Sequence, residues 1–142
     1  MQTKADIIHR WYKDVWENGE WDKIERYYTP VSDNACLIPG GTISLDEVRE
    51  LIQVLNDLIS NQRVNVVHTI ENGDWVSALV QLDGVRAGTK EPVSLRWQAL
   101  VRFEDQRIVE SYPTVNFLNF FEQLKQLPEN SFELLLSGTV LR

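Results

Sequence analysis

Apolar and polar residues alternate most clearly between residues 92 and 114. From Leu95 to Phe103, apolar residues occupy every second position and the positions between them are mostly polar. This period of two is the pattern of a β-strand with one buried and one exposed face. The polar segment 104–107 is typical of a tight turn, and residues 108–112 return as a second strand. We therefore predict a long antiparallel hairpin, whose apolar face must be covered by other parts of the chain.

The first residues of the chain have apolar side chains at the spacing of an α-helix. Thr3 and Asp6 form a capping-box pattern, and apolar residues then recur at helical spacing as far as Trp16. Asn18-Gly19 is expected to end this helix, because both residues tolerate the left-handed cap conformation. A short second helix is predicted for residues 21–28.

The later segments alternate between helical and strand patterns. The expected elements are a strand at 35–38, a loop at 39–41, a helix from the capping box at Ser44, strands at 63–71 and 74–83, and a helix at 117–124. Asn72-Gly73, between the last two of those strands, is a strong hairpin signal. The apolar segment from Phe132 to Leu136 is predicted to be a last strand or an extended arm.

This order of elements, with helices first and antiparallel strands after them, indicates an α+β fold. A strongly twisted sheet wrapped around the N-terminal helices is the simplest way to bury both apolar sets. Such a sheet has a concave side, and a pocket results where the helices do not fill it. A length of 142 residues predicts one domain, spanning residues 1–142.

Charge and composition narrow the class of partner. The formal net charge is −7, and no basic tail or patch is visible, which argues against nucleic acid and against an anionic membrane surface. No apolar run is long enough to span a bilayer and the first residues lack a signal-peptide core, so we expect a cytoplasmic protein. Cys36, the only cysteine, is expected to be a small core residue rather than a nucleophile.

Three segments resemble a known family. They are Trp16-Glu17-Asn18-Gly19-Glu20-Trp21-Asp22, Asn72-Gly73-Asp74-Trp75-Val76, and the run from Val101 to Glu110. They are similar to the SnoaL-like polyketide cyclases of the nuclear transport factor two-like superfamily, and the resemblance covers nearly the whole chain in element order. It implies a cone-shaped, curved antiparallel sheet that holds an apolar pocket under the N-terminal helices and usually dimerises through the sheet. Family members include cyclases, isomerases, hydrolases, dehydratases and pure binding domains, so fold alone does not choose an activity.

One departure from the family pattern affects the chemistry. In the cyclases, the strand after the turn often reads Ile-Val-Glu-His-Trp-Asp, and its Asp is the acid or base. The matching run here is Ile108-Val109-Glu110-Ser111-Tyr112-Pro113. Pro113 therefore stands at the acid position and Ser111 at the histidine position, and the cyclase mechanism is not transferred to this chain.

Candidate catalytic residues come from the strand parities. Glu110 and Tyr112 share one parity, and Arg96 and Gln98 share one on the preceding strand. If these faces coincide and point into the pocket, Glu110 would be a base whose pKa is raised by burial, and Arg96 would polarise a carbonyl group. The alternative is a cross-strand ion pair between Arg96 and Glu110 on an exposed or dimer-facing surface.

Other candidates are a histidine and a set of aromatic residues. His68, in the middle of a predicted strand, would shuttle a proton if it faces the pocket, or would be a hydrogen-bonded sheet residue without a catalytic role. The aromatic candidates for lining the pocket, each with a plain core role as the alternative, are Tyr12, Trp16, Trp97 and Tyr112. We expect no metal, because the two histidines lie far apart without an acidic cluster, and no cofactor.

Two functions follow from these observations. The first is a lyase or isomerase that transfers a proton on a hydrophobic carbonyl compound without a cofactor, using Glu110, Arg96 and His68. The second is a non-catalytic ligand-binding or interaction domain, which Pro113 favours. Both imply a small hydrophobic ligand. We also expect a homodimer, because the outer face of the sheet needs cover.

Overall fold

The computed structural model describes residues 2–35 and 42–142. The helices are α1 (Lys4–Trp11), the π-helix η1 (Tyr12–Glu17), the 3-10 helix η2 (Trp21–Lys23), α2 (Ile24–Tyr27), α3 (Leu45–Asp57), α4 (Phe117–Gln123) and α5 (Ser131–Leu136). The strands are β1 (Tyr28–Ala35), β2 (Thr42–Ile43), β3 (Ile59–Asn72), β4 (Trp75–Arg86), β5 (Pro92–Glu104) and β6 (Arg107–Val115). The mixed α+β class predicted from the sequence is confirmed.

The strands form one sheet in the order β2-β1-β6-β5-β4-β3. The predicted hairpins β3–β4 and β5–β6 are both present and antiparallel. β1 and β6 are instead parallel, which departs from the antiparallel pairing expected throughout the sheet. These two strands lie far apart in the sequence, so no tight turn between them imposes an antiparallel direction.

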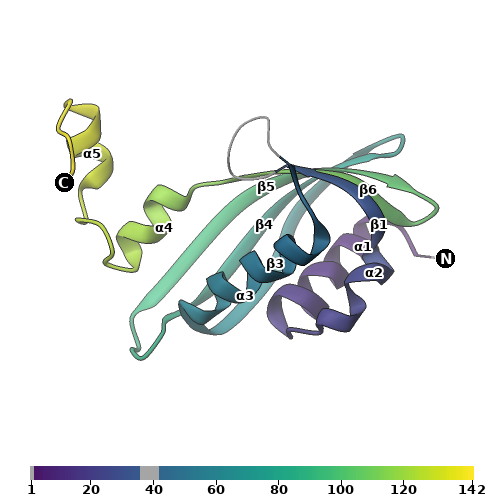
Figure 1. The fold of residues 1–142 in the computed structure, drawn as a ribbon, viewed down its shortest axis with the longest axis horizontal. Helices are drawn as coiled ribbons and strands as arrows, with labels where there is room; N and C mark the ends of the chain where they lie inside the picture. Colours follow the sequence, from purple (N-terminus) through teal and green to yellow (C-terminus); the bar gives the residue numbers. More distant parts are fainter. Residues whose placement is uncertain (1, 36–41) are drawn as a thin grey trace.

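The sheet is strongly curved, and α1, α2 and α3 lie on its concave side (Figure 1). β5 shows why the helices lie there, because its odd-numbered positions are buried and its even-numbered positions face outward. The buried set, from Val93 to Phe103, joins the apolar faces of the helices in one core. α4 follows β6 and buries Phe120 and Leu124, whereas α5 projects away from the sheet (Figure 1).

Local signals in the sequence account for the helix boundaries. The capping boxes at Thr3 and Ser44 are both formed, with the side chain of each accepting from a backbone N–H three residues later. Gly19 has a φ of +68°, which an L-residue with a side chain adopts at a cost, and it follows the end of η1.

None of the helices in the described ranges is long and apolar enough to cross a membrane.

The structure changes two of the predicted elements. The first strand runs over Tyr28–Ala35, earlier than predicted, and the predicted segment 36–38, with Cys36, and the loop 39–41 lie outside the described residues. The segment from Phe132 to Leu136 belongs to helix α5 and is neither a strand nor an extended arm. A short apolar run does not by itself distinguish a helix from a strand, which explains this error.

Candidate ligand cavity

A mainly apolar cavity of about 80 Å³ lies between the helices and the concave face of the sheet. Its lining comes from α1, η1, β1, β2, α3, β5 and β6, with Phe117 at the start of α4. Ala99 explains the empty space, because it is the small residue between Trp97 and Val101 in the buried row of β5. Its partner across the β5–β6 ladder is Pro113, which also lines the cavity.

Aromatic rings form one wall of this cavity. The ring centroids of Trp16 and Trp97 lie 5.1 Å apart, and those of Tyr12 and Trp97 lie 5.6 Å apart. The indole Nε1 of Trp97 donates a hydrogen bond to the hydroxyl oxygen of Tyr12 at 3.2 Å. Tyr12, Trp16 and Trp97, which the sequence indicated as pocket residues, therefore meet in the same cavity.

The π-helix η1 sets the positions of two of these rings, since Tyr12 and Trp16 both lie within it. The amide of Asn56 on α3 donates to the backbone oxygen of Trp16 at 2.9 Å, and Glu17 accepts from the backbone N–H of Val64 at 2.8 Å. Burial acts to raise the pKa of Glu17, but hydrogen bonds from Lys13 and Val64 outweigh it and the pKa is lowered. η1 is therefore attached to both α3 and the edge strand β3.

A polar group of residues forms another part of the lining. Asn34 is 2% exposed and Ser111 is 7% exposed. The Ser111 hydroxyl donates to the side-chain oxygen of Asn34 at 2.7 Å, and the Asn34 amide donates to the Ser32 hydroxyl at 2.8 Å. Burial raises the pKa of Tyr28 to about 12, with a smaller opposing effect of Ser111, and burial likewise raises the pKa of Tyr12. Both phenols are therefore neutral at physiological pH.

Two further residues of the cavity lining are the ones that depart from the family pattern described above, Pro113 at the acid position and Ser111 at the histidine position. Neither side chain exchanges a proton near neutral pH. The lining formed by the described residues contains no aspartate, glutamate, histidine, lysine, arginine or cysteine.

The predicted catalytic pair lies outside the cavity. Arg96 and Glu110 are on the outer face of the sheet, because the opposite parity of β5 faces the core. Glu110 pairs with Arg102, its direct cross-strand neighbour, at 2.8 Å, and also accepts from the Tyr112 hydroxyl at 2.7 Å. Arg96 donates instead to Gln81 at 2.8 Å. From the sequence, the alternative to catalysis is a cross-strand ion pair of Glu110 on an exposed face. Such a pair is present on the outer face, but Glu110 pairs with Arg102 and not with Arg96.

The remaining sequence candidates also lie on the outer face. Gln98 and Tyr112 have the same outward parity, and neither lines the cavity. His68 is exposed on β3 and stands opposite Leu79 of β4. The structure therefore does not bring His68, Arg96 and Glu110 around one enclosed space.

Glu110 has a testable effect on stability. The Tyr112 hydroxyl and the Arg102 guanidinium stabilise its carboxylate and hold its pKa below the usual 4.5, contrary to the rise expected for a buried base. A lowered pKa in the folded state stabilises the protein above the unfolded-state pKa, and this contribution is lost as pH falls through the folded-state value. We expect Glu110→Gln to melt below the wild type at pH 7. The difference should shrink as pH falls below about 4. Thermal melts across this range test this, and a variant more stable than wild type at pH 7 would contradict it.

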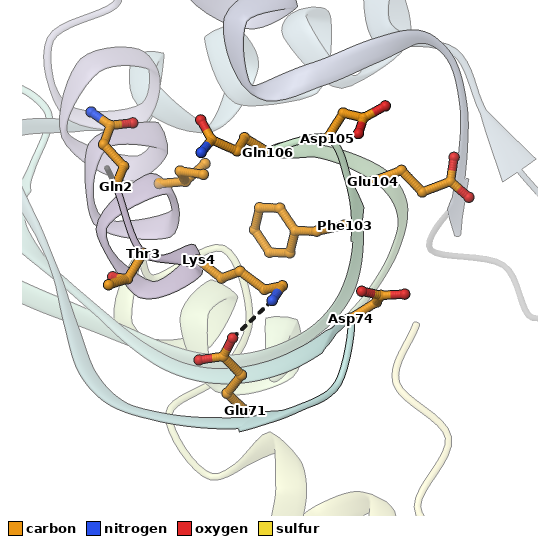
Figure 2. Close-up of a pocket in the computed structure, with 10 residues that line it drawn as sticks. Gln2, Thr3, Lys4, Glu71, Asp74, Phe103, Glu104, Asp105 and Gln106 are labelled. Carbon is orange, nitrogen blue, oxygen red and sulfur yellow. Dashed lines mark hydrogen bonds and ion pairs between the residues drawn. The ribbon is translucent and has the colours of Figure 1, made fainter.

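A larger open cleft, of about 680 Å³, lies between the start of α1 and the two hairpin turns (Figure 2). Phe103 is at its centre, and Lys4 forms an ion pair with Glu71 across it at 3.0 Å. Glu104 and Asp105 are exposed, and Figure 2 shows their carboxylates pointing away from the centre. These charges are solvated and do not converge on one point. Among the described residues there is also no group of three or more histidine, cysteine or acidic side chains that could hold a metal ion.

Sequence reasoning missed several residues of the cavity. Trp11, Tyr28, Asn34 and Ser111 all line it, and none was among the candidates. Ser111 and Ala99 were detectable in principle, because they follow the buried parity once that parity is assigned to the concave face. Asn34 carried no such signal, since its burial depends on the parallel pairing of β1 with β6.

Comparisons with known proteins agree with this architecture. The SnoaL-like domain model matches residues 8–111. No curated protein matches the chain. Among solved structures, IdmH of Streptomyces antibioticus, a polyketide cyclase candidate, is 16% identical with a TM-score of 0.75, and the match covers 87% of this chain and 99% of that one.

Two other solved structures are similar. A polyketide cyclase candidate from Bacillus cereus ATCC 10987 is 16% identical with a TM-score of 0.74, over 87% of this chain and 79% of that one. The hydroxylase candidate AclR of Streptomyces galilaeus is 18% identical with a TM-score of 0.70, over 87% of this chain and 86% of that one. At these identities the likeness concerns the fold alone.

Proposed function

We propose, from the premise that this chain belongs to the SnoaL-like domain family, that the protein binds a small hydrophobic molecule without catalysing proton transfer. The site is the cavity between α1, η1, α3 and the sheet. The observation that carries this proposal is its lining, which is aromatic and aliphatic with a few neutral polar groups. Ligand sites of proteins generally have this composition.

The same lining is the reason why we do not propose proton-transfer catalysis in this cavity. A general acid or base must lie within hydrogen-bond reach of the reacting atom and have a pKa near the working pH. The titratable side chains in the described lining are Tyr12 and Tyr28, and burial raises the pKa of both phenols further above neutrality. Glu110, Arg96 and His68 lie on the opposite face of the sheet from this cavity, so the sheet separates them from a ligand bound there.

Filling the cavity tests the proposal. Ala99→Leu adds apolar atoms where the space lies, so we expect a folded protein that no longer binds. A library of small apolar compounds should raise the melting temperature of the wild type, because a ligand that binds only the folded state stabilises it by about 2.7 kcal/mol at one hundred times its Kd. The same compounds should leave the melting temperature of Ala99→Leu unchanged.

Gln98→Leu is the matched control, because it places the same side chain at the neighbouring position on the outer face. We expect this variant to respond to the compounds as the wild type does. Equal responses of the wild type and Ala99→Leu would mean that the compounds bind elsewhere, and the proposal would then be wrong.

We also infer that the protein forms a homodimer through the outer face of the sheet. Ile70, Leu100 and Tyr112 lie in one row across the strands, in register with Ser77, and are 74%, 43% and 43% exposed. A row of exposed apolar side chains on a sheet indicates an interaction surface. Its continuity over β3, β4, β5 and β6 supports contact with an equally extended surface, such as a second copy.

Sedimentation equilibrium at micromolar concentration tests this inference. We expect twice the chain mass of 16.5 kDa for the wild type and the mass of one chain for Leu100→Glu. Leu136→Glu, which changes an exposed leucine of α5, should remain dimeric. A wild type that sediments as one chain would exclude the dimer, and dissociation by Leu136→Glu would move the interface to α5.

A further inference from the structure

We infer that the protein has a second binding site, which accepts a doubly charged phosphate group, either as the free ion or as a phosphate ester of a small molecule. The site is a pocket of about 270 Å³ between α1, α2 and the turn from β5 to β6. It shares no lining residue with the apolar ligand cavity. The inference therefore goes beyond the proposed binding function and does not depend on it.

Three arginines from separate elements line this pocket. Arg10 lies on α1, Arg26 on α2 and Arg107 at the start of β6, so they meet only in the folded chain. Within the described ranges none of the three forms an ion pair, although the chain has 21 acidic and only 14 basic residues. A pocket that gathers cations of one sign attracts an anion from solution.

The guanidinium group of Arg107 is held in place by the backbone. Its Nη2 donates to the backbone oxygen of Glu25 at 2.7 Å and to that of Tyr28 at 3.2 Å. Its Nε is buried and has no acceptor among the described residues. Both backbone acceptors are neutral, so the positive charge of Arg107 is not balanced. A cation that is already fixed loses little conformational freedom when an anion binds.

The other two arginines lie near the ring of Tyr27, which also lines the pocket. Burial and the hydrogen bond to Asp14 raise the pKa of Tyr27 to about 12, and the charges of Arg10 and Arg26 both oppose this rise. Arg10 also lies beside the side-chain amide of Gln2, which is neutral. Both arginines are exposed, so an anion in solution can reach them.

The acidic residues near the pocket do not cancel this charge. Asp6 accepts from the backbone N–H of Thr3 in the capping box, and Asp14 pairs with Lys23. Neither of these two carboxylates lines the pocket, whereas Asp105 does. Three arginines and one aspartate give the lining a net charge of +2.

This charge favours a phosphate group over a carboxylate. A phosphate monoester carries about 1.5 to 2 negative charges near neutral pH and has three acceptor oxygens, which guanidinium groups bind in pairs. A carboxylate offers one charge and two oxygens. The pocket volume of about 270 Å³ lies just below the roughly 300–1,000 Å³ of sites for drug-sized ligands, so a phosphate group with a small substituent suits it.

The experiment titrates methyl phosphate into the isotope-labelled full chain, and the backbone amide resonances of Tyr27 and Arg107 are followed by NMR. The titration is made at about pH 8, where the monoester is almost fully dianionic. Sodium chloride keeps the ionic strength constant, because salt screens exposed charges. We expect both resonances to shift. Dimethyl phosphate, which carries one charge, should bind about tenfold or more weakly, the factor that one charge-assisted hydrogen bond supplies.

Variants then test the role of the arginines. Arg26→Gln and Arg10→Gln should each weaken binding of methyl phosphate by about tenfold or more. Both positions are exposed, so we expect both variants to fold. Arg49→Gln is the matched control, because it removes one positive charge from an exposed position of α3 outside this pocket. It should bind as the wild type does, and so should Ala99→Leu, whose change lies in the apolar cavity.

Inorganic phosphate identifies the source of the group. Tighter binding of methyl phosphate than of inorganic phosphate would indicate an ester, and the reverse would indicate the free ion; both results support the site. If methyl phosphate shifts neither resonance, or if dimethyl phosphate binds as tightly, the inference is wrong. It is also wrong if Arg49→Gln weakens binding as much as Arg26→Gln does. None of these failures affects the apolar cavity, which the apolar compounds and Ala99→Leu test separately.

Discussion

Replacing Trp97 with alanine is expected to destabilise the fold by about 3–5 kcal/mol, the usual cost of removing a large buried aromatic side chain. Trp97 is 3% exposed and contacts the rings of Tyr12 and Trp16, so its removal would leave a large void in the middle of the core. The hydroxyl of Tyr12 would also lose the donor that it now has. Because small domains are stable by only about 5–15 kcal/mol, this loss is a large part of the total.

Urea unfolding followed by circular dichroism measures this loss. The matched control is Trp75→Ala on β4, because Trp75 stacks on Tyr112 at 6.3 Å on the outer face and is half-buried. Its replacement should cost about 1 kcal/mol or less. Both substitutions are best made in the Leu100→Glu background, which removes any contribution from association through the sheet. Equal losses from the two tryptophans would contradict the assignment of the buried parity.

Replacing Phe120 with alanine is the second change with a large expected effect, again about 3–5 kcal/mol. Phe120 is 1% exposed and belongs to the core although it lies on α4, after the last strand. α4 is also bound to the sheet by Gln123, whose side-chain amide donates to the backbone oxygen of Ser94 and accepts from its N–H, both at 2.8 Å. This amide takes the place of a strand partner for β5 beyond the end of β6. We therefore expect α4 to unfold together with the sheet.

Phe132→Ala is the matched control for this prediction. Phe132 lies on the neighbouring helix α5 and is 53% exposed. Its loss should change the free energy of unfolding by at most about 0.5 kcal/mol, as is usual for surface positions. Comparable losses at Phe120 and Phe132 would mean that α5 packs on the chain more closely than its exposure indicates.

The positions of most elements could be predicted from the sequence because the signals for them are local. The capping boxes at Thr3 and Ser44, the Asn72-Gly73 turn and the alternation of β5 each depend on a few neighbouring residues. The need to bury both apolar sets predicted a twisted sheet with a concave side, and the resemblance to SnoaL-like proteins implied the same curved sheet. The aromatic residues Tyr12, Trp16 and Trp97 were identified because their spacing placed them on buried faces.

Which parity of the sheet faces the cavity depended on the tertiary structure. Glu110 and Arg96 share the polar parity, and alternation shows that two faces differ without showing which one encloses a ligand. The packing of α1, η1 and α3 decides this, because their apolar faces cover the row that contains Trp97 and Ala99. Asn34 is buried in the same way by a long-range contact, the parallel pairing of β1 with β6. Local sequence determines the elements of this protein, whereas the cavity exists only where segments distant in the sequence meet, since no single segment encloses it.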